Sequence, residues 1–226
     1  MTPSTLSLAQ PRPCNADPSA APLAQDAVSR NVVKHSGLVS GAERCALLHQ
    51  QPATVWLTGL SGAGKSTLAY AAERRLHAQG RLGFVLDGDN IRHHLNRDLG
   101  FSPSDRRENI RRIAEVAALM NDAGLIVFTA LISPRQEDRE LARSIIGEAR
   151  FVEVHVSTAL AVCEARDPKG LYEKARTGAI PHFTGVSAPY ETPQSPALRI
   201  DTDICGLDQA VGQLMDFLAD RCSLAS

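Results

Sequence analysis

The chain has 226 residues, a net charge of −1 and 43% hydrophobic residues, which suits one domain with a sizeable core. The balanced charge offers no global basic field for nucleic acid, so an anionic ligand must be held by local groups. No apolar run is long enough to span a bilayer, and the N-terminus lacks the pattern of a signal peptide. The five cysteines are dispersed, which indicates reduced thiols, with a redox-sensing pair as the alternative. We therefore expect a cytoplasmic protein without a nucleic-acid or membrane partner.

Residues 1–29 are rich in Pro, Ala and Ser and carry no sustained apolar period. Such a segment buries too little apolar surface to fold by itself, so we expect a disordered tail. An organellar transit peptide is the alternative, which Asp17, Asp26 and the scarcity of arginine disfavour.

From residue 30 on, short apolar runs alternate with helical patterns. Strands are predicted at residues 54–58, 82–86, 125–130, 151–156 and 197–200. Helices are predicted at residues 66–79, 105–123, 138–149, 158–166 and 207–220. Strands that are apolar throughout and separated by helices indicate a parallel sheet covered on both faces. The sequence therefore predicts an α/β fold.

Residues 167–190 break this alternation, because they hold three glycines, three prolines, Phe183 and two tyrosines. A long irregular segment inside a compact domain usually has a functional reason. We predict that residues 167–190, called the lid segment below, form a lid over the site.

The stretch GLSGAGKS at residues 59–66 matches G-x-x-x-x-G-K-[ST] and lies between a predicted strand and a predicted helix. Glycines allow the backbone dihedrals that point successive N–H groups at an anion, and the helix N-terminus adds its dipole. In this motif the lysine reaches the β- and γ-phosphates and the hydroxyl ligates Mg²⁺, roles that fall to Lys65 and Ser66. The guanine-selecting pattern N/T-K-x-D is absent, which disfavours a GTPase. The residues expected to bind the nucleoside triphosphate are Gly59, Leu60, Ser61, Gly62, Ala63, Gly64, Lys65, Ser66 and Thr67.

Two carboxylates follow the second predicted strand, in the sequence VLDGDN. Asp87 and Asp89 lie at the edge of an open α/β sheet where ligands bind. Their side chains point the same way on an extended segment, so both can face the cleft. We expect one to serve Mg²⁺ and the other an acceptor hydroxyl. The alternative is that Asp87 caps a helix in an Asp-Gly turn.

Polar side chains lie on the apolar face of the helix predicted at residues 105–123. Arg106 and Asn109 project from this face, with Arg112 at its border, whereas Arg107 and Arg111 fit a solvated face. A buried guanidinium needs a partner, and a ligand with phosphate-like oxygens suits its planar fork. We therefore expect Arg106, Asn109 and Arg112 to bind a phosphate-bearing ligand.

The motifs in chain order resemble those of adenylyl-sulfate kinases (APS kinases) over about residues 30–221. They are GLSGAGKST, LDGDNIRHHLN, DLGFS..DR.ENIRR, LISP, CEARDPKGLYEKAR and FTG...PYE. The resemblance implies a P-loop kinase domain over residues 30–226. It implies transfer of the γ-phosphoryl group of ATP to the 3′-hydroxyl of adenosine 5′-phosphosulfate (APS). The products would be 3′-phospho-APS (PAPS) and ADP, in sulfate assimilation.

The same resemblance implies a set of site residues. Those that would bind the acceptor are Asp89, Arg92, Phe101, Arg106, Asn109, Ile132, Ser133, Lys169, Leu171 and Phe183. Those with a catalytic role would be Lys65, Asp89, Ser133 and Lys169, while Ser66 and Asp87 would bind Mg²⁺. Phe101 and Phe183 would stack on the adenine, and Asp89 would orient or deprotonate the 3′-hydroxyl. Ser133 matches the serine described as a phosphorylated intermediate in this family; the alternative is a hydrogen bond to the substrate.

The resemblance also implies binding partners, and two other functions fit the phosphate loop. The resemblance implies ATP and APS as substrates, a homodimer, and ATP sulfurylase as a further partner. One rival is a kinase that acts on another small-molecule hydroxyl. The other is a regulatory nucleotide-binding protein, for instance a partner of ATP sulfurylase, that has lost catalysis.

Overall fold

The computed structural model describes residues 32, 33, 35 and 37–222. The chain divides into two units, residues 1–38 and 39–226, and the fold below is that of the second unit. The tail predicted over residues 1–29 lies outside the described residues.

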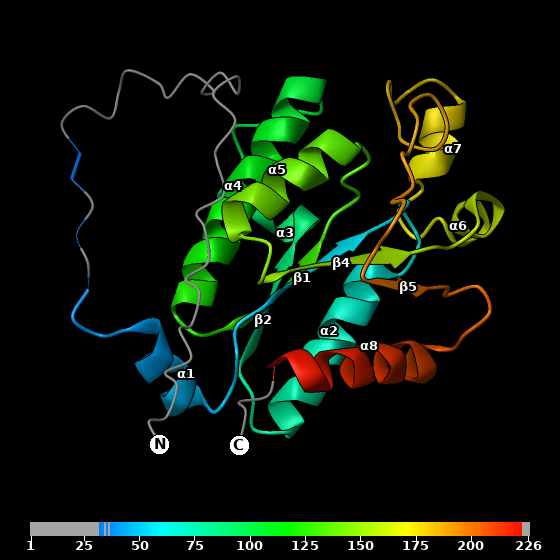
Figure 1. The fold of residues 1–226 in the computed structure, drawn as a ribbon. Coiled ribbons are helices and arrows are strands. Elements are labelled where there is room, and N and C mark those ends of the chain that lie inside the picture. The colour runs from blue at the N-terminus through cyan, green and yellow to red at the C-terminus, as the bar shows by residue number, and fades with distance from the viewer. Residues whose placement is uncertain (1–31, 34, 36, 223–226) are drawn as a thin grey trace, which may run out of the picture. The chain divides into compact units, whose positions relative to one another are not determined.

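Five parallel strands form one sheet in the order β2-β3-β1-β4-β5 (Figure 1). The strands are β1 (Thr54–Thr58), β2 (Gly83–Asp87), β3 (Ile126–Ala130), β4 (Phe151–Val156) and β5 (Leu198–Ile200). Every residue of β1, β3 and β4 is buried, as expected for strands covered on both faces. The predicted parallel sheet is confirmed, with strand ends within one residue of those expected.

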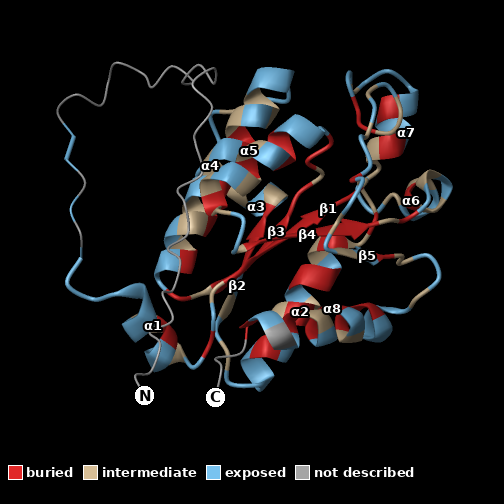
Figure 2. Ribbon diagram, viewed as in Figure 1, coloured by how far each residue is buried: buried red, intermediate tan, exposed pale blue. Residues whose placement is uncertain are grey.

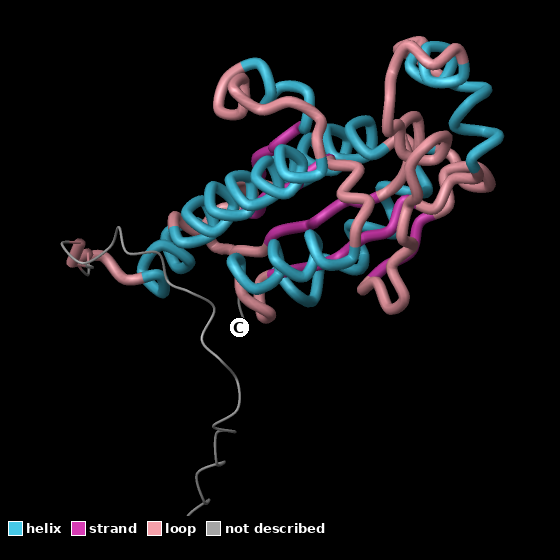
Figure 3. The backbone as a smooth tube through the Cα atoms, turned by 90° about the horizontal axis from the view of Figure 1, so that it is seen from above, coloured by secondary structure: helices cyan, strands magenta, loops and turns pink. Residues whose placement is uncertain are grey.

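Helices cover both faces of the sheet (Figures 1 and 3). One layer holds α2 (Lys65–Ala78) and α8 (Leu207–Cys222), and the other holds α4 (Pro103–Asp122) and α5 (Gln136–Ile146). Strand β1 serves both layers because successive side chains point to opposite faces. Val55 and Leu57 belong to the core under α2 and α8, whereas Trp56 belongs to the core under α4 and α5.

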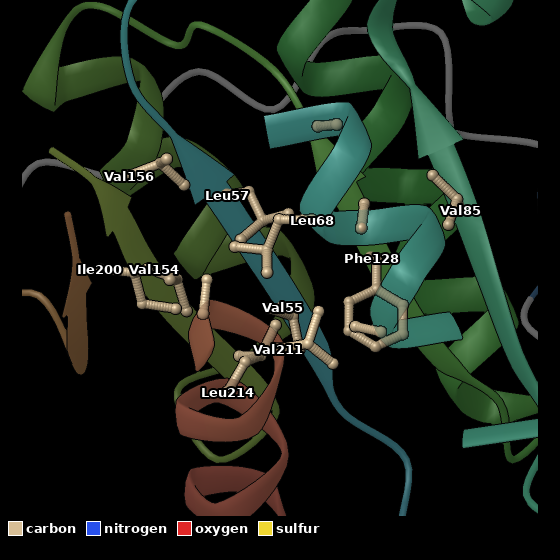
Figure 4. Packing of buried hydrophobic residues seen from close by; sticks show 14 of the residues in the cluster. Val55, Leu57, Leu68, Val85, Phe128, Val154, Val156, Ile200, Val211 and Leu214 are labelled. Carbon is tan, nitrogen blue, oxygen red and sulfur yellow. The ribbon is translucent and has the colours of Figure 1, made fainter. Parts of the chain in front are cut away.

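The interior on both sides of the sheet is apolar, and the outer helix faces are exposed (Figure 2). On the α2 and α8 side, Leu68 and Leu214 pack with Val55 and Leu57 of β1, and Phe128 of β3 joins the same cluster (Figure 4). Leu68, Leu214 and Phe128 are fully buried. This packing fixes α2, and with it the loop that precedes α2.

Four shorter helices complete the described part of this unit, and the sequence predicted one of them. They are α1 (Gly41–Leu48), α3 (Gly88–His93), α6 (Leu160–Arg166) and α7 (Leu171–Arg176). Only α6 was expected. Helix α1 begins with a full capping box between Ser40 and Glu43, a local signal that the sequence contains. Helix α7 lies within the lid segment, so this segment is partly helical rather than irregular throughout.

The carboxyl ends of the strands meet at one edge of the sheet, called the carboxyl edge below. Residue Gly59 follows β1, Asp87 ends β2, Ser133 follows β3 and Thr158 follows β4. In open α/β sheets ligands bind at this edge. The fold therefore gathers the residues singled out in the sequence.

A pair of leucine substitutions tests the helix layers. Leu214→Ala should lower the free energy of unfolding by about 2–5 kcal/mol, because Leu214 is 0% exposed and its removal leaves a cavity. Leu119→Ala is the matched control in α4, where the side chain is 69% exposed, and should change stability by less than about 0.5 kcal/mol. Urea denaturation measures both, and equal losses would contradict this core assignment.

Candidate active site

The loop at residues 59–64 joins β1 to α2 and requires glycine on steric grounds. Gly59 and Gly62 have φ values of 153° and 75°. A Cβ would lie 2.5 Å from the Val156 carbonyl oxygen at Gly59, and 2.9 Å from that of Cys163 at Gly62. Gly64 is the N-cap of α2, and no side chain caps this helix. The amides of its first turn are therefore available to an anion.

Lys65 is folded back on this loop. Its Nζ donates to the carbonyl oxygens of Gly59 at 3.0 Å and Leu60 at 2.7 Å, and the residue is 7% exposed. Burial lowers the pKa of the Lys65 ammonium to about 8. Phosphate oxygens in the loop would offer this cation a charged partner in place of two neutral carbonyls.

Ser66 and Asp87 lie together at the carboxyl edge, which fits a divalent cation. The Ser66 hydroxyl donates to Asp87 Oδ2 at 2.6 Å. Oδ1 of Asp87 accepts from the N–H groups of Asp89 at 3.0 Å and Asn90 at 3.3 Å, so Asp87 also caps α3. Within residues 37–222 no group of three His, Cys, Asp or Glu side chains could hold a metal. A cation here would therefore have few protein ligands, as Mg²⁺ has when phosphates and water supply the rest.

Asp89 and Lys169 form an ion pair between the carboxyl edge and the lid segment. Asp89 lies in the first turn of α3, and Lys169 lies just before α7. Their side chains are 60% and 53% exposed. Both groups can therefore exchange this contact for one with a ligand at little cost.

Arg92 and Arg106 make contacts around the loop before α4. The guanidinium of Arg92 lies 4.4 Å from the ring centroid of Phe101, which is 66% exposed. Arg106 donates to the carbonyl oxygens of Phe101 and His182, both at 2.9 Å, and to Thr184 Oγ1 at 3.1 Å. Arg106 thereby attaches α4 to the lid segment.

Protein groups bond the arginines and the asparagine of α4 that were expected to bind a phosphate-bearing ligand, and their binding of a ligand stays a prediction. Arg106 has the partners given above. Arg112 donates to both carboxylate oxygens of Asp98 and to Glu108. Asn109 is buried and accepts from the amide of Asn96 at 3.0 Å. Asp98, Asn96, His182 and Thr184 lie outside α4, so helical periodicity does not reveal them, whereas Glu108 is the i,i+4 neighbour of Arg112 on the same helix.

The two arginines expected to face solvent are confirmed as exposed. Arg107 and Arg111 are 49% and 45% exposed. Each also pairs with a carboxylate, Arg107 with the buried Asp138 and Arg111 with Glu108.

Ser133 is buried and held in an unusual conformation. Its φ is 38°, a left-handed value that is uncommon for serine. Its Oγ accepts from Trp56 Nε1 at 3.2 Å, and its carbonyl oxygen accepts from Arg139 at 2.9 Å. The preceding carbonyl, of Ile132, accepts from Thr58 Oγ1 at 2.8 Å. Backbone strain of this kind persists where neighbours fix it, and it is common at functional sites.

Phe183 and Leu171 of the lid segment are turned inward. Phe183 is 7% exposed, and its ring meets that of Tyr172 edge-on at 5.1 Å between centroids. Leu171 donates its N–H to Asp167 at 2.8 Å. Stacking of Phe183 on a base requires the lid segment to move, and it stays a prediction.

A cavity of about 610 Å³ lies between the phosphate loop and the lid segment. It is lined by Leu60, Leu160 and residues 185–190. This volume is within the range of small-molecule sites. The lining adjoins the phosphate loop at Leu60 but includes neither Lys65 nor Asp89.

Several residues that shape the site were not predicted. Thr158 and Thr202 donate to the carbonyl oxygen of Ala63 in the phosphate loop, and Arg166 bonds Thr202. Tyr172 donates to the carbonyl oxygen of Ser61. Thr158 could have been found from the sequence, because it follows a predicted strand. Tyr172 could not, because Ser61 is 111 residues away and approaches it only in the folded chain.

The parallel sheet, the phosphate loop after β1 and the carboxylates Asp87 and Asp89 after β2 together define a P-loop kinase. The sequence pattern of the adenylylsulphate kinase family matches residues 51–201. The chain belongs to the adenylylsulphate kinase family. The family assignment made from the motifs is thereby confirmed, with ATP as the phosphoryl donor.

Three similar proteins illustrate this membership. The adenylyl-sulfate kinase of Shewanella amazonensis is 55% identical over 188 residues, which are 83% of this chain and 95% of the relative. The Mycobacterium tuberculosis APS kinase, solved in complex with AMPPNP and APS, is 50% identical with a TM-score of 0.72. That match covers 75% of this chain and 98% of the other. A hexameric APS kinase from Thiobacillus denitrificans is 37% identical with a TM-score of 0.58, covering 79% of this chain and 31% of the other.

The buried Lys65 makes stability depend on pH. The folded protein holds this ammonium at a pKa of about 8 instead of 10.5, so the unfolded chain binds more protons between these values. The free energy of unfolding should therefore rise with pH in this window, by about 1–3 kcal/mol relative to a Lys65→Met variant. Below pH 8 the penalty is complete. Denaturation of both proteins from pH 7 to 10 measures the difference, and a constant difference would contradict this account.

Proposed function

We propose that this protein transfers the γ-phosphoryl group of ATP to the 3′-hydroxyl of APS, giving PAPS and ADP in sulfate assimilation. The observation that carries the proposal is the ion pair of Asp89 and Lys169 beside the phosphate loop. A carboxylate can receive the proton of an acceptor hydroxyl, and an ammonium can balance the charge of the group in transfer. These residues belong to a kinase domain that we place at residues 30–226, with residues 167–190 as its lid.

Lys65 and Lys169 neutralise the transferring group from two sides. Lys65 exchanges the carbonyls of Gly59 and Leu60 for phosphate oxygens. Its pKa then rises again, because opposite charge favours the ammonium. Lys169 exchanges Asp89 for the phosphoryl oxygens, which leaves the carboxylate free for the 3′-hydroxyl. Phosphoryl transfer depends mostly on such positioning and charge neutralisation.

Ser66 and Asp87 are the residues that would hold Mg²⁺. A hydroxyl and a carboxylate supply the hard oxygen ligands that this ion prefers. Held by Ser66 and Asp87, this ion would supply positive charge that balances the charge of the nucleotide phosphates. Asp87 keeps its bonds to the amides of Asp89 and Asn90, so it also orients the start of α3 and the carboxylate of Asp89.

The acceptor is held on the side of α3 and α4. Its contacts are proposed for Arg92, Phe101, Arg106, Asn109, Ile132, Ser133, Leu171 and Phe183. Exposed Phe101 is available for stacking on the adenine. Arg106, which bonds the lid segment, and buried Phe183 contact the acceptor after this segment moves. The indole N–H bonded to Ser133 Oγ occupies one of its lone pairs, which supports a hydrogen-bonding role for Ser133 over a phosphorylated intermediate.

We further propose a homodimer that acts in the cytoplasm, with ATP sulfurylase as an additional partner. Cys45, Cys163, Cys205 and Cys222 are free thiols, which agrees with a reducing compartment. Among the described helices, none is long and apolar enough to cross a membrane. Sedimentation analysis at several protein concentrations tests the dimer, and addition of purified sulfurylase tests the second partner.

Coupled measurement of ADP release tests the central proposal. ATP, Mg²⁺ and APS should give turnover that ATP and Mg²⁺ alone do not. Sugars and nucleosides tested as acceptors at the same concentration should give far less. Turnover with one of these instead of APS would favour the rival kinase, and ATP binding without any turnover would favour the regulatory protein.

Asp89→Asn should lower kcat by about 10²–10⁴-fold, because the amide cannot accept the hydroxyl proton. The affinity for ATP should stay within about threefold, since among the described residues Asp89 bonds Asp87 and Lys169 rather than the phosphate loop. Glu115→Gln removes an exposed carboxylate of α4 as the control and should leave both unchanged. Steady-state kinetics and ATP titration measure these effects, and full activity of Asp89→Asn would reject the assigned role.

A further inference from the structure

Tyr172 connects the lid segment to the phosphate loop through a hydrogen bond. Its hydroxyl donates to the carbonyl oxygen of Ser61 at 2.9 Å, and the residue is 3% exposed. Burial raises the pKa of this phenol above its ordinary value, so it stays protonated and remains a donor. The bond is therefore shielded from water and from changes of pH near neutrality.

The ring of Tyr172 contacts the acceptor side of the site. Its centroid lies 5.1 Å from that of Phe183 at an interplanar angle of 80°, the edge-on arrangement that aromatic pairs favour. Both rings belong to the apolar core that also contains Ala63 of the phosphate loop. Tyr172 thus reaches the loop with its hydroxyl and a proposed adenine-binding residue with its ring.

The same helix turn fixes Lys169. The Asp167 carboxylate accepts the N–H groups of Leu171 at 2.8 Å, Tyr172 at 3.0 Å and Glu173 at 3.2 Å. Lys169 lies between Asp167 and this first turn of α7. The bonds from Asp167 to the turn therefore restrict the backbone of Lys169. The position of Tyr172 relative to Ser61 therefore sets where Lys169 stands relative to the phosphate loop.

We propose that Tyr172 is a positioning residue that couples occupancy of the phosphate loop to the acceptor site. The inference deepens the proposed function and rests on it for the identity of the acceptor. When donor phosphates replace the carbonyls of Gly59 and Leu60 as partners of Lys65, the bond from Tyr172 to Ser61 holds α7, and with it Lys169 and Phe183, against the occupied loop. Donor and acceptor then strengthen each other's binding, and thermodynamic linkage requires that both do so by the same factor.

Titration calorimetry with ADP and APS measures this coupling. The dissociation constant of APS is determined without ADP and at saturating ADP with Mg²⁺, and the ratio of the two is the coupling factor. The reverse pair of titrations must give the same factor. In Tyr172→Phe the factor should fall by about three- to tenfold, the effect of one hydrogen bond. Tyr70→Phe is the matched control, because it removes a hydroxyl that bonds Asn90 and should leave the factor unchanged.

A second measurement does not depend on APS. Binding of ADP with Mg²⁺ should slow amide hydrogen exchange in α7 of the unmodified protein and of Tyr70→Phe, but not in Tyr172→Phe. If APS gives no turnover, the proposed function fails, yet this exchange experiment still decides the role of Tyr172. A coupling factor of one in the unmodified protein overturns the proposal. So does a Tyr172→Phe variant that melts at a lower temperature but keeps the factor and the exchange protection, since its role is then structural only.

Discussion

The parallel pairing of β3 with both β1 and β2 brings the phosphate loop, Asp87 and Ser133 to one edge of the sheet. These residues come from segments that lie far apart in the sequence, so the pairing of the strands brings them together. Because strands aligned in parallel end at the same side, each loop at this edge contributes a functional group to one space. The apolar packing of α2 and α4 on opposite faces keeps this register, since a slip by one residue would reverse every side chain.

The charged groups of the site are satisfied by the protein in ways that a ligand can replace. Lys65 bonds two carbonyls of its own loop, and Asp89 pairs with Lys169. The bonds of Lys65 are buried, and their hydrogen-bond acceptors are neutral carbonyls. A negatively charged phosphate oxygen would therefore bind this ammonium more strongly. The ion pair of Asp89 and Lys169 is exposed and contributes little to stability, so it separates readily. Lys65, Asp89 and Lys169 can therefore each give up a protein partner for a ligand. In the proposed function, these charges act on the reacting groups only when both nucleotides are bound.

The strands, the long helices and the phosphate loop could be predicted because their signals are local. Apolar runs mark β1 and β4, and the glycine and lysine spacing marks the loop. The partners of Arg106 and Arg112 could not be predicted, since His182 and Asp98 approach them only in the folded chain. The same holds for Tyr172 and Ser61, which are 111 residues apart. Helix α1 could also have been predicted, because the residues of its capping box, Ser40 and Glu43, are close together in the sequence.

The close approach of Gly59 to Val156, and of Gly62 to Cys163, has an evolutionary consequence. Any side chain at these positions would collide with backbone of β4 or α6 whether or not a nucleotide is present. Selection for a folded domain alone would thus retain both glycines in a descendant that no longer catalyses a reaction. Loss of Asp89 or Lys169, whose exposed ion pair contributes little to stability, would leave the glycine signature in place.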